Sequence, residues 1–180
     1  MDVPLEDEKR IACFLRLLPA TRIKNAIIPE TNKHLYRPLS FGEFIKFLGL
    51  WVITMCFPGI NRSKFFSTST ITSIWDGDSP VKLHRIMNSC RFEELNQNMQ
   101  FTKNEFPPHK DKFHEVREII AAFNDHMKKL VIPSWISYLD ESMSPWTMRW
   151  NCPGLMCVPR KSHPMGNDHH IVACGVSGAF

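Results

Sequence analysis

The sequence predicts an α+β fold, with a mostly helical region in residues 1–133 and the beginning of a sheet in residues 134–180. Two observations predict this arrangement. Before Pro133, apolar residues recur three and four positions apart, as they do on one face of a helix. After Pro133, short aromatic and β-branched runs lie between prolines, glycines and acidic residues, as strands do. A composition of 43% hydrophobic and 22% charged residues can build the packed core that this fold needs.

The first third of the chain predicts two helices joined by a connector. Residues 5–18 carry apolar side chains at helical spacing and precede a proline. Residues 19–39 contain two further prolines and are expected to form the connector. Ser40 and Glu43 form a capping box, in which each side chain can bind the other residue's backbone N–H. The helix that follows, residues 41–56, is apolar almost all round, so we expect it to be buried on most sides.

The middle of the chain predicts shorter helices and then one long helix. Residues 61–78 indicate a short helix followed by a loop rich in serine and threonine. Two short helices are expected over 80–88 and 91–99, the first of them starting at a Ser-Pro pair. Asp111 can cap a long helix over 112–130, whose apolar residues are three and four positions apart.

Beyond Pro133 the pattern favours strands. Residues 135–139 are aromatic and β-branched and predict a first strand, and residues 169–176 predict a second. The intervening residues 144–168 are rich in proline and glycine and are expected to be mostly loop. We expect residues 135–140 and 169–175 to pair in the antiparallel direction.

Charge and composition exclude several classes of protein. There are 22 lysines and arginines against 18 aspartates and glutamates, so the net charge of +4 is compatible with a nucleic-acid partner without establishing one. The longest apolar run, residues 47–57, is too short to span a bilayer, and the acidic start is unlike a signal peptide. The six cysteines form no CxxC pair and indicate reduced intracellular thiols. Phosphate-binding loop and nucleophile-elbow motifs are absent, so neither a membrane nor a small-molecule substrate is predicted.

The acidic pair Asp140-Glu141 directly follows the first predicted strand. A carboxylate at the exit of a strand is a usual position for a metal ligand. Acidic residues at strand ends are also common turn formers, with Asp140 capping a turn and Glu141 in solvent. The residues alone leave both interpretations open.

Basic and thiol groups near the end of the sequence suggest two further kinds of site. Arg160, Lys161 and His163 lie in a loop constrained by proline and glycine, which is either a surface for a phosphate backbone or an ordinary basic loop. Cysteines and histidines raise the question of zinc, but their spacings match no zinc signature. These residues are Cys152, Cys157, His163, His169, His170 and Cys174.

Six segments, in order along the chain, resemble the PiggyBac transposase family. The most specific is Tyr138–Pro145 (YLDESMSP), which resembles the motif on the first strand of the family's catalytic core. The other five are residues 40–67 (SFGEFIKFLGLWVITMCFPGINRSKFFS), 86–104 (IMNSCRFEELNQNMQFTKN), 112–133 (KFHEVREIIAAFNDHMKKLVIP), 158–166 (VPRKSHPMG) and 169–180 (HHIVACGVSGAF).

The resemblance implies a DDE/D DNA transposase with an RNase H-like core. In that family three aspartates hold two Mg²⁺ ions, which activate water or a 3′-hydroxyl for in-line displacement at phosphorus. Asp140 matches the first of the three, while Glu141 belongs to the motif without binding metal. Residues 1–133 match the dimerisation and DNA-binding region, so the implied partners are DNA and a second copy of the chain, and the implied location is the nucleus. The basic residues expected to contact DNA are Lys128, Lys129, Arg149, Arg160 and Lys161.

Departures from the family pattern bear on activity. The family's second and third aspartates lie beyond Phe180, and Asp168, the only acidic residue after Glu141, matches no ligand position. One carboxylate does not hold two Mg²⁺ ions. We therefore expect a truncated form that lacks cut-and-paste activity and binds no Mg²⁺ stably. The alternatives are a domesticated, non-catalytic module that binds DNA or protein, and an incomplete part of an active transposase.

Overall fold

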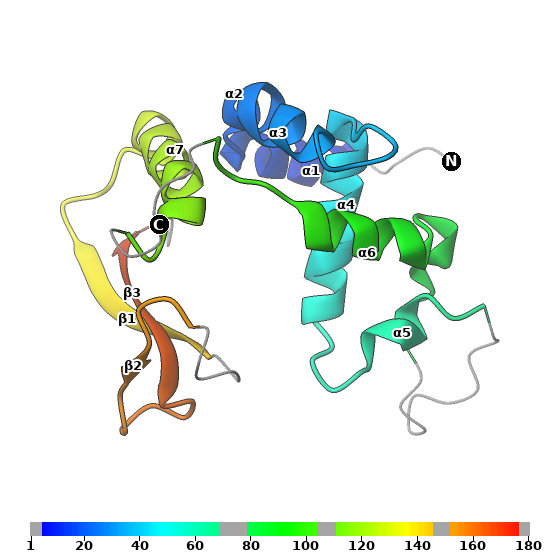
Figure 1. Cartoon of the computed structure of the whole chain (residues 1–180). Coiled ribbons are helices and arrows are strands. Elements are labelled where there is room, and N and C mark those ends of the chain that lie inside the picture. The colour runs from blue at the N-terminus through cyan, green and yellow to red at the C-terminus, as the bar shows by residue number, and fades with distance from the viewer. Residues whose placement is uncertain (1–4, 69–78, 104–110, 146–151, 177–180) are drawn as a thin grey trace. The chain divides into compact units, whose positions relative to one another are not determined.

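Two compact units make up the chain. The helical unit comprises Thr21–Lys103, and the mixed unit comprises Met1–Ala20 together with Asn104–Phe180 (Figure 1). Helices occur in both units and a three-stranded antiparallel sheet in the mixed unit, so the predicted α+β class is confirmed. The functional division expected at residue 133 stays a prediction. The computed structural model describes residues 5–68, 79–103, 111–145 and 152–176.

The predicted connector over 19–39 is helical through about its first two thirds, up to Asn32, which corrects the prediction. The first helix, α1 (Leu5–Leu17), agrees with expectation. Pro29 does not break the helical stretch that follows, because it lies in the first turn of its last segment, where its missing N–H is not needed. The preceding turn is π-helical, and the Ile28 N–H donates to the carbonyl of Ile23. The stretch comprises α2 (Ala20–Arg22), η1 (Ile23–Ile27) and α3 (Ile28–Asn32).

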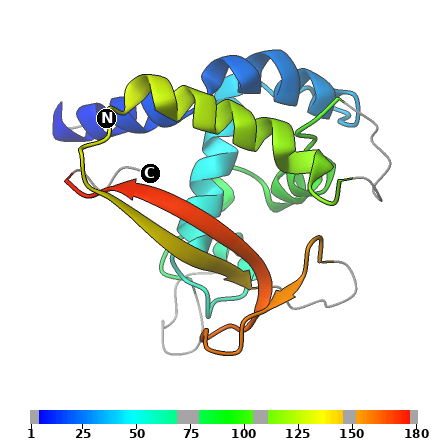
Figure 2. The ribbon, with the colours of Figure 1, turned by 90° about the vertical axis from the view of Figure 1, so that its left-hand side faces the viewer.

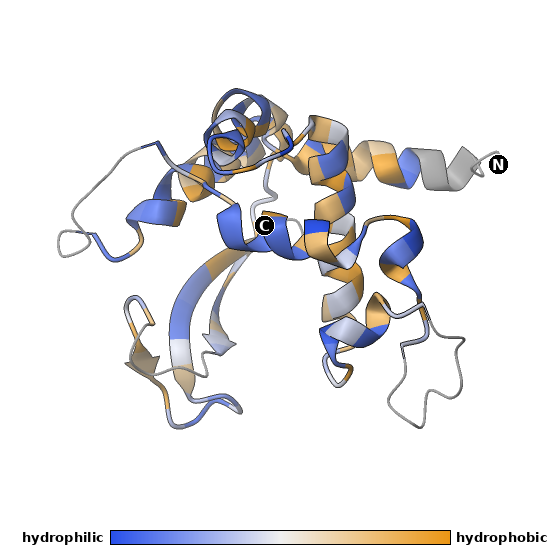
Figure 3. Cartoon of the chain, turned by 45° about the vertical axis from the view of Figure 1, so that its right-hand side comes forward, coloured by the Kyte–Doolittle hydropathy of each residue, from blue (hydrophilic) through white to orange (hydrophobic). Residues whose placement is uncertain are grey.

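Helix α4 (Phe41–Met55) begins at the predicted cap. The Ser40 hydroxyl accepts the Glu43 N–H at 3.1 Å, but the Glu43 carboxylate binds Arg37 and Arg91 instead of reaching back to Ser40. Although hydrophobic residues occupy most of the helix (Figure 3), only one stripe of it is buried, so the expectation of burial on most sides is wrong. The buried residues are Phe44, Phe47 and Leu50, and the exposed apolar ones are Val52 and Met55.

Three shorter elements complete the helical unit: α5 (Arg62–Phe65), η2 (Leu83–Arg85) and α6 (Ser89–Asn98). α5 and α6 match predicted helices, whereas the helix expected over 80–88 is a single 3₁₀ turn. The Ser79 hydroxyl accepts the Val81 N–H and so forms a local turn instead of a helix cap. The loop expected after α5 lies mostly outside the described residues. The most deeply buried apolar side chains of this unit are Ile27, Leu50, Phe65, Leu83, Phe92 and Leu95.

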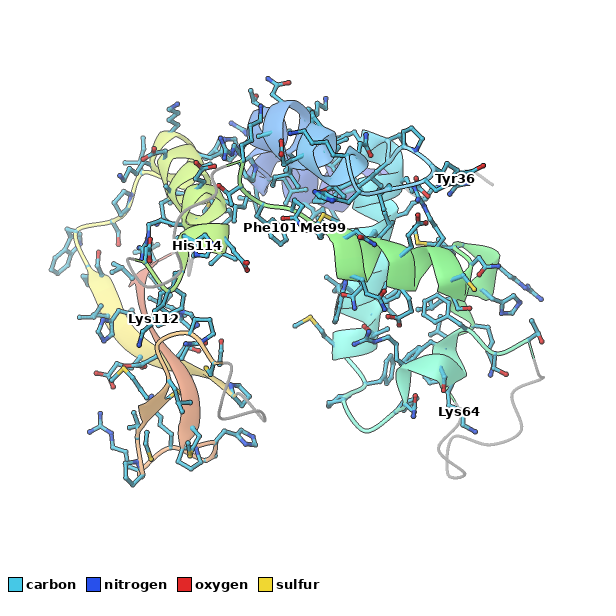
Figure 4. All side chains as sticks on the ribbon, viewed as in Figure 1. Tyr36, Lys64, Met99, Phe101, Lys112 and His114 are labelled. Carbon is cyan, nitrogen blue, oxygen red and sulfur yellow. The ribbon has the colours of Figure 1, made fainter. Side chains whose placement is uncertain are left out.

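The long predicted helix is α7 (His114–Leu130), in the mixed unit. It starts later than expected, because Asp111 forms a local turn before it. The Asp111 carboxylate accepts the Phe113 N–H at 3.0 Å and binds Arg117. The His114 ring nitrogen Nδ1 lies 3.1 Å from the Asp111 carbonyl. Figure 4 labels His114 at the start of α7. The α7 helix has no fully buried residue among those described. None of the helices within the described residues combines the length and the apolar composition that spanning a bilayer requires.

The sheet consists of a long hairpin-like pair and one short edge strand. β1 (Ser137–Pro145) pairs antiparallel with β3 (Met165–Cys174), and β2 (Met156–Cys157) pairs with the start of β3. The strand order is therefore β1-β3-β2, and Figure 2 shows the two long strands side by side. The predicted antiparallel pairing is confirmed. The strands are longer than expected, however, and the segment 144–168 contains β2 and the first residues of β3.

A glycine permits close approach where β1 and β3 meet at one end of the sheet. Gly166 faces Pro145 of β1 on one side and Met156 of β2 on the other. A Cβ atom at this position would collide with the backbone carbonyl of Ser144. Only glycine therefore fits this register without a shift of the backbone.

Candidate functional site

Asp140 lies in the middle of β1 and not at its exit, which corrects the expectation drawn from the sequence. It is paired with Ile171 of β3, and its side chain is exposed. Its own carboxylate accepts the N–H of Glu141 at 2.8 Å. Because side chains alternate along a strand, Asp140 and Glu141 lie on opposite faces of the sheet.

The surroundings of Asp140 bear on the Mg²⁺ pair that DDE transposases typically use. Within the described part of the chain, no group of three or more metal-ligating side chains includes Asp140. Its strand partner Ile171 supplies no ligand, and Glu141 is on the other face. These residues therefore do not fit a pair of Mg²⁺ ions, each of which requires several oxygen ligands.

The predicted basic loop is held against β1 by contacts with Glu141. Arg160 Nη2 donates to Glu141 Oε2 at 3.1 Å, and Lys161 Nζ donates to the Glu141 backbone carbonyl at 2.6 Å. The loop is closed by the Val158 N–H, which donates to the Pro164 carbonyl at 2.8 Å. The Arg160 side chain is still 75% exposed, so its charge remains accessible to an anion.

The other predicted DNA contacts lie at the end of α7 or outside the described residues. Lys128 and Lys129 are in the last turn of α7 and are exposed. Lys128 pairs with Asp125 at 3.2 Å, an exposed contact that is worth little in water. Arg149 lies outside the described residues.

A cluster that the sequence analysis did not assemble lies on the Glu141 face of the sheet. Glu141 is directly opposite His170, and Asp168 is two residues away from His170 along β3. The potential ligand atoms of these three residues all lie within 4.8 Å of one another. These three side chains lie close together only because of the register between β1 and β3, which are distant in the sequence. The sequence predicted that the two strands pair, but it did not indicate which residues lie opposite each other.

The cysteines do not form the zinc site considered from the sequence. Among the described residues, no metal-ligating group of three or more includes a cysteine. Cys174 is buried and contacts Ser134, as expected of a core residue. Cys152 lies 3.6 Å from the side-chain oxygen of Asn167. His169 and His170 lie on opposite faces of β3.

The helical unit contains an ion-pair network that the sequence also did not reveal. The Arg91 guanidinium is bidentate on the Glu43 carboxylate, with Nε and Nη2 both at 2.9 Å, and Arg91 Nη1 binds Glu94 at 2.9 Å. Arg37 adds a third contact to Glu43 at 2.6 Å. These hydrogen bonds lower the pKa of Glu43 and of Glu94, chiefly through Arg91, and raise the pKa of Arg91. Because each charge faces an opposite one, the network is suited to holding α4 and α6 together.

A family match covers nearly the whole sequence. The family model described as Transposase IS4 matches residues 10–179. The match includes both compact units and the strand β1 that carries Asp140. No match was found among curated proteins or solved structures.

Proposed function

Because this chain belongs to the Transposase IS4 family of DDE-type transposases, we propose that it is a DNA-binding protein derived from a PiggyBac-like transposase. We further propose that residues 1–180 neither cleave nor join DNA by themselves. The motif Tyr138–Pro145 and the five other resembling segments support the PiggyBac assignment. The family match by itself supports a DDE-type origin with DNA as the partner.

The surroundings of Asp140 carry the proposal that catalysis is lost. Two-metal phosphoryl transfer needs several carboxylates that hold two ions about 4 Å apart. Asp140 is exposed in mid-strand, and no described group of metal ligands includes it. A single exposed carboxylate does not organise two divalent ions.

A nuclease assay tests the proposal that residues 1–180 neither cleave nor join DNA. We expect no nicking or joining of supercoiled DNA in Mg²⁺ or Mn²⁺ by the purified chain. Asp140→Asn is the matched variant, because it removes the charge and keeps the shape of an exposed side chain. Metal-dependent nicking that disappears in Asp140→Asn would overturn the proposal.

DNA binding is expected to be electrostatic and independent of sequence. The net charge is only +4, and the candidate contacts are exposed basic side chains. Each neutralised phosphate contributes a slope of about −0.9 to a plot of log affinity against log salt concentration. A few contacts therefore give modest affinity that falls steeply as salt is added. The candidate residues are Lys128, Lys129, Arg149, Arg160 and Lys161.

Fluorescence anisotropy with a random-sequence duplex measures this slope. Replacing both Lys128 and Lys129 with alanine should weaken binding and reduce the magnitude of the slope by about 1–2. Lys33→Ala is the matched control, since Lys33 is an exposed lysine that pairs with Glu30 just as Lys128 pairs with Asp125. Binding that does not depend on salt, or an equal effect of Lys33→Ala, would argue against this mode of contact.

Homodimerisation and a nuclear location complete the proposal. Apolar side chains exposed on the sheet, among them Leu139 and Val172, support association with another protein surface. Light scattering after size exclusion is expected to give the mass of two chains, and a fluorescent fusion is expected to accumulate in nuclei. A monomer at micromolar concentration would contradict the dimer.

A further inference from the structure

Three side chains with metal-binding groups share the face of the sheet opposite Asp140. Glu141 of β1 is directly across from His170 of β3, and Asp168 is the next residue of β3 on that face. β1 thus contributes one carboxylate, and β3 contributes one carboxylate and one imidazole. Asp140, the residue assigned to the ancestral catalytic site by resemblance, is on the other face and takes no part.

The distances are close to those of a metal site. His170 Nε2 lies 3.9 Å from Glu141 Oε1 and 3.7 Å from Asp168 Oδ2. A tetrahedral ion with bonds of about 2.0–2.2 Å to nitrogen and oxygen separates its ligand atoms by roughly 3.3–3.6 Å. The two distances to His170 exceed this separation by less than about 1 Å, and the distance between the two carboxylates is at most 4.8 Å, so binding requires the three side chains to move closer together.

A second, independent observation concerns the other oxygen of Asp168. Oδ1 is buried and has no hydrogen-bond partner within the described residues, and the whole side chain is only 12% exposed. Buried carboxylate oxygens are normally hydrogen-bonded, because leaving one unsatisfied is costly. A cation bound through both carboxylate oxygens of Asp168 would supply the missing partner of Oδ1.

Neighbouring basic residues orient Glu141 toward the cluster. Arg160 Nη2 binds Glu141 Oε2 at 3.1 Å, which leaves Oε1 on the side of His170. Lys161 binds the Glu141 backbone carbonyl at 2.6 Å and fixes the loop beside it. Such contacts to a ligating carboxylate are typical of the outer shell of a metal site.

We propose that Glu141, Asp168 and His170 bind one Zn²⁺ ion, with solvent as the fourth ligand. One imidazole and two carboxylates form a donor set that Zn²⁺ accepts, whereas Mg²⁺ prefers oxygen ligands alone. The ion would join β1 to β3 across the middle of their pairing and stabilise the exposed sheet. This site is separate from the proposed loss of DNA cleavage and does not depend on it.

Titration of the full chain with Zn²⁺ alone, after removal of metal with a chelator, tests the proposal. We expect one ion per chain and a higher unfolding temperature when it is bound. His170→Gln and Glu141→Gln should each weaken binding at least tenfold. His169→Gln is the matched control, because it alters the neighbouring histidine on the other face and should leave the affinity unchanged. His170→Gln changes an exposed side chain, so it avoids the folding defect that changing Asp168 risks.

Cobalt distinguishes this site from adventitious binding to cysteine. Co²⁺ should bind competitively with Zn²⁺ and show visible absorption without a thiolate charge-transfer band. A thiolate band, unchanged affinity in His170→Gln, an equal loss in His169→Gln, or no binding by the wild-type chain would each overturn the proposal.

Discussion

Replacing Glu43 with glutamine should destabilise the helical unit measurably. The Glu43 carboxylate receives two hydrogen bonds from Arg91 and one from Arg37. The Arg91 side chain is only 8% exposed, and that of Glu43 is 18% exposed. Glutamine keeps the shape and one acceptor oxygen, but it loses the charge and the second acceptor that Arg91 requires.

The expected loss in the free energy of unfolding lies between the loss caused by breaking an exposed ion pair and that caused by breaking a fully buried one. Removing one partner of a buried pair costs about 3–5 kcal/mol, because the other charge is left uncompensated. Arg91 keeps its contact with Glu94 at 2.9 Å, and Glu43 is partly in water, so the cost is reduced. We expect a loss of about 2–3 kcal/mol in the free energy of unfolding, or roughly 5–10 °C in unfolding temperature for a chain of this length.

The effect should also depend on pH in a defined direction. The hydrogen bonds from Arg91 hold the pKa of Glu43 below its ordinary value of 4.5. A carboxylate with a lowered pKa in the folded state contributes stability above its unfolded pKa, and this contribution is lost as pH falls through the folded pKa. The difference between wild type and Glu43→Gln should therefore be full near pH 7 and shrink below about pH 4.5.

Urea unfolding followed by circular dichroism measures both quantities. Asp125→Asn is the control, because it removes an exposed pair with Lys128 and should change stability by less than about 0.5 kcal/mol. If Glu43→Gln cost no more than this control, the network would not hold α4 to α6. A difference that grew as pH fell would refute the electrostatic explanation.

Three further predictions concern single residues. Gly166→Ala should cost at least about 2 kcal/mol and accelerate amide exchange in β3, because the new methyl group meets the rigid carbonyl of Ser144; unchanged exchange would contradict the register. Phe92→Ala should cost about 3–5 kcal/mol in urea unfolding, because Phe92 is fully buried, and a loss below about 1 kcal/mol would contradict its place in the core. Hydrogen bonding from Arg117 lowers the pKa of Asp111 to about 2, and Arg117→Ala should return the carboxyl titration seen by NMR toward 3.8; a titration already near 3.8 in wild type would contradict the contact.

Local sequence signals predicted those elements whose ends are fixed by local chemistry. α4 was predictable because the Ser40 hydroxyl satisfies the Glu43 amide regardless of the rest of the fold. The antiparallel partners were predictable from β-branched and aromatic runs. The helical stretch through Pro29 was not, because proline usually ends a helix but is tolerated in the first turn of a helical segment, and no local signal marked the start of that segment.

Features that depend on long-range pairing could not be predicted locally. The sequence from Asp140 to Pro145 has weak strand propensity, but pairing with β3 makes it extended. Arginine side chains are normally exposed. The burial of Arg91 on α6 follows from its pairing with Glu43 on α4, which is distant in the sequence. The cluster of Glu141 with β3 required the register of the strands, which no local pattern fixes.

The adjacent acidic residues of β1 have a consequence for how the sheet finds its alignment. Because Asp140 and Glu141 are both carboxylates, a slip of one residue that brings Asp140 opposite His170 would still place an acidic side chain there. The attraction between His170 and an acidic side chain of β1 therefore does not distinguish the observed alignment from this slipped one. Gly166 constrains the observed alignment more strictly, because a Cβ atom at this position would collide with the Ser144 carbonyl. The alignment of β1 with β3 therefore depends more on the absence of a side chain at Gly166 than on the attraction between charged side chains.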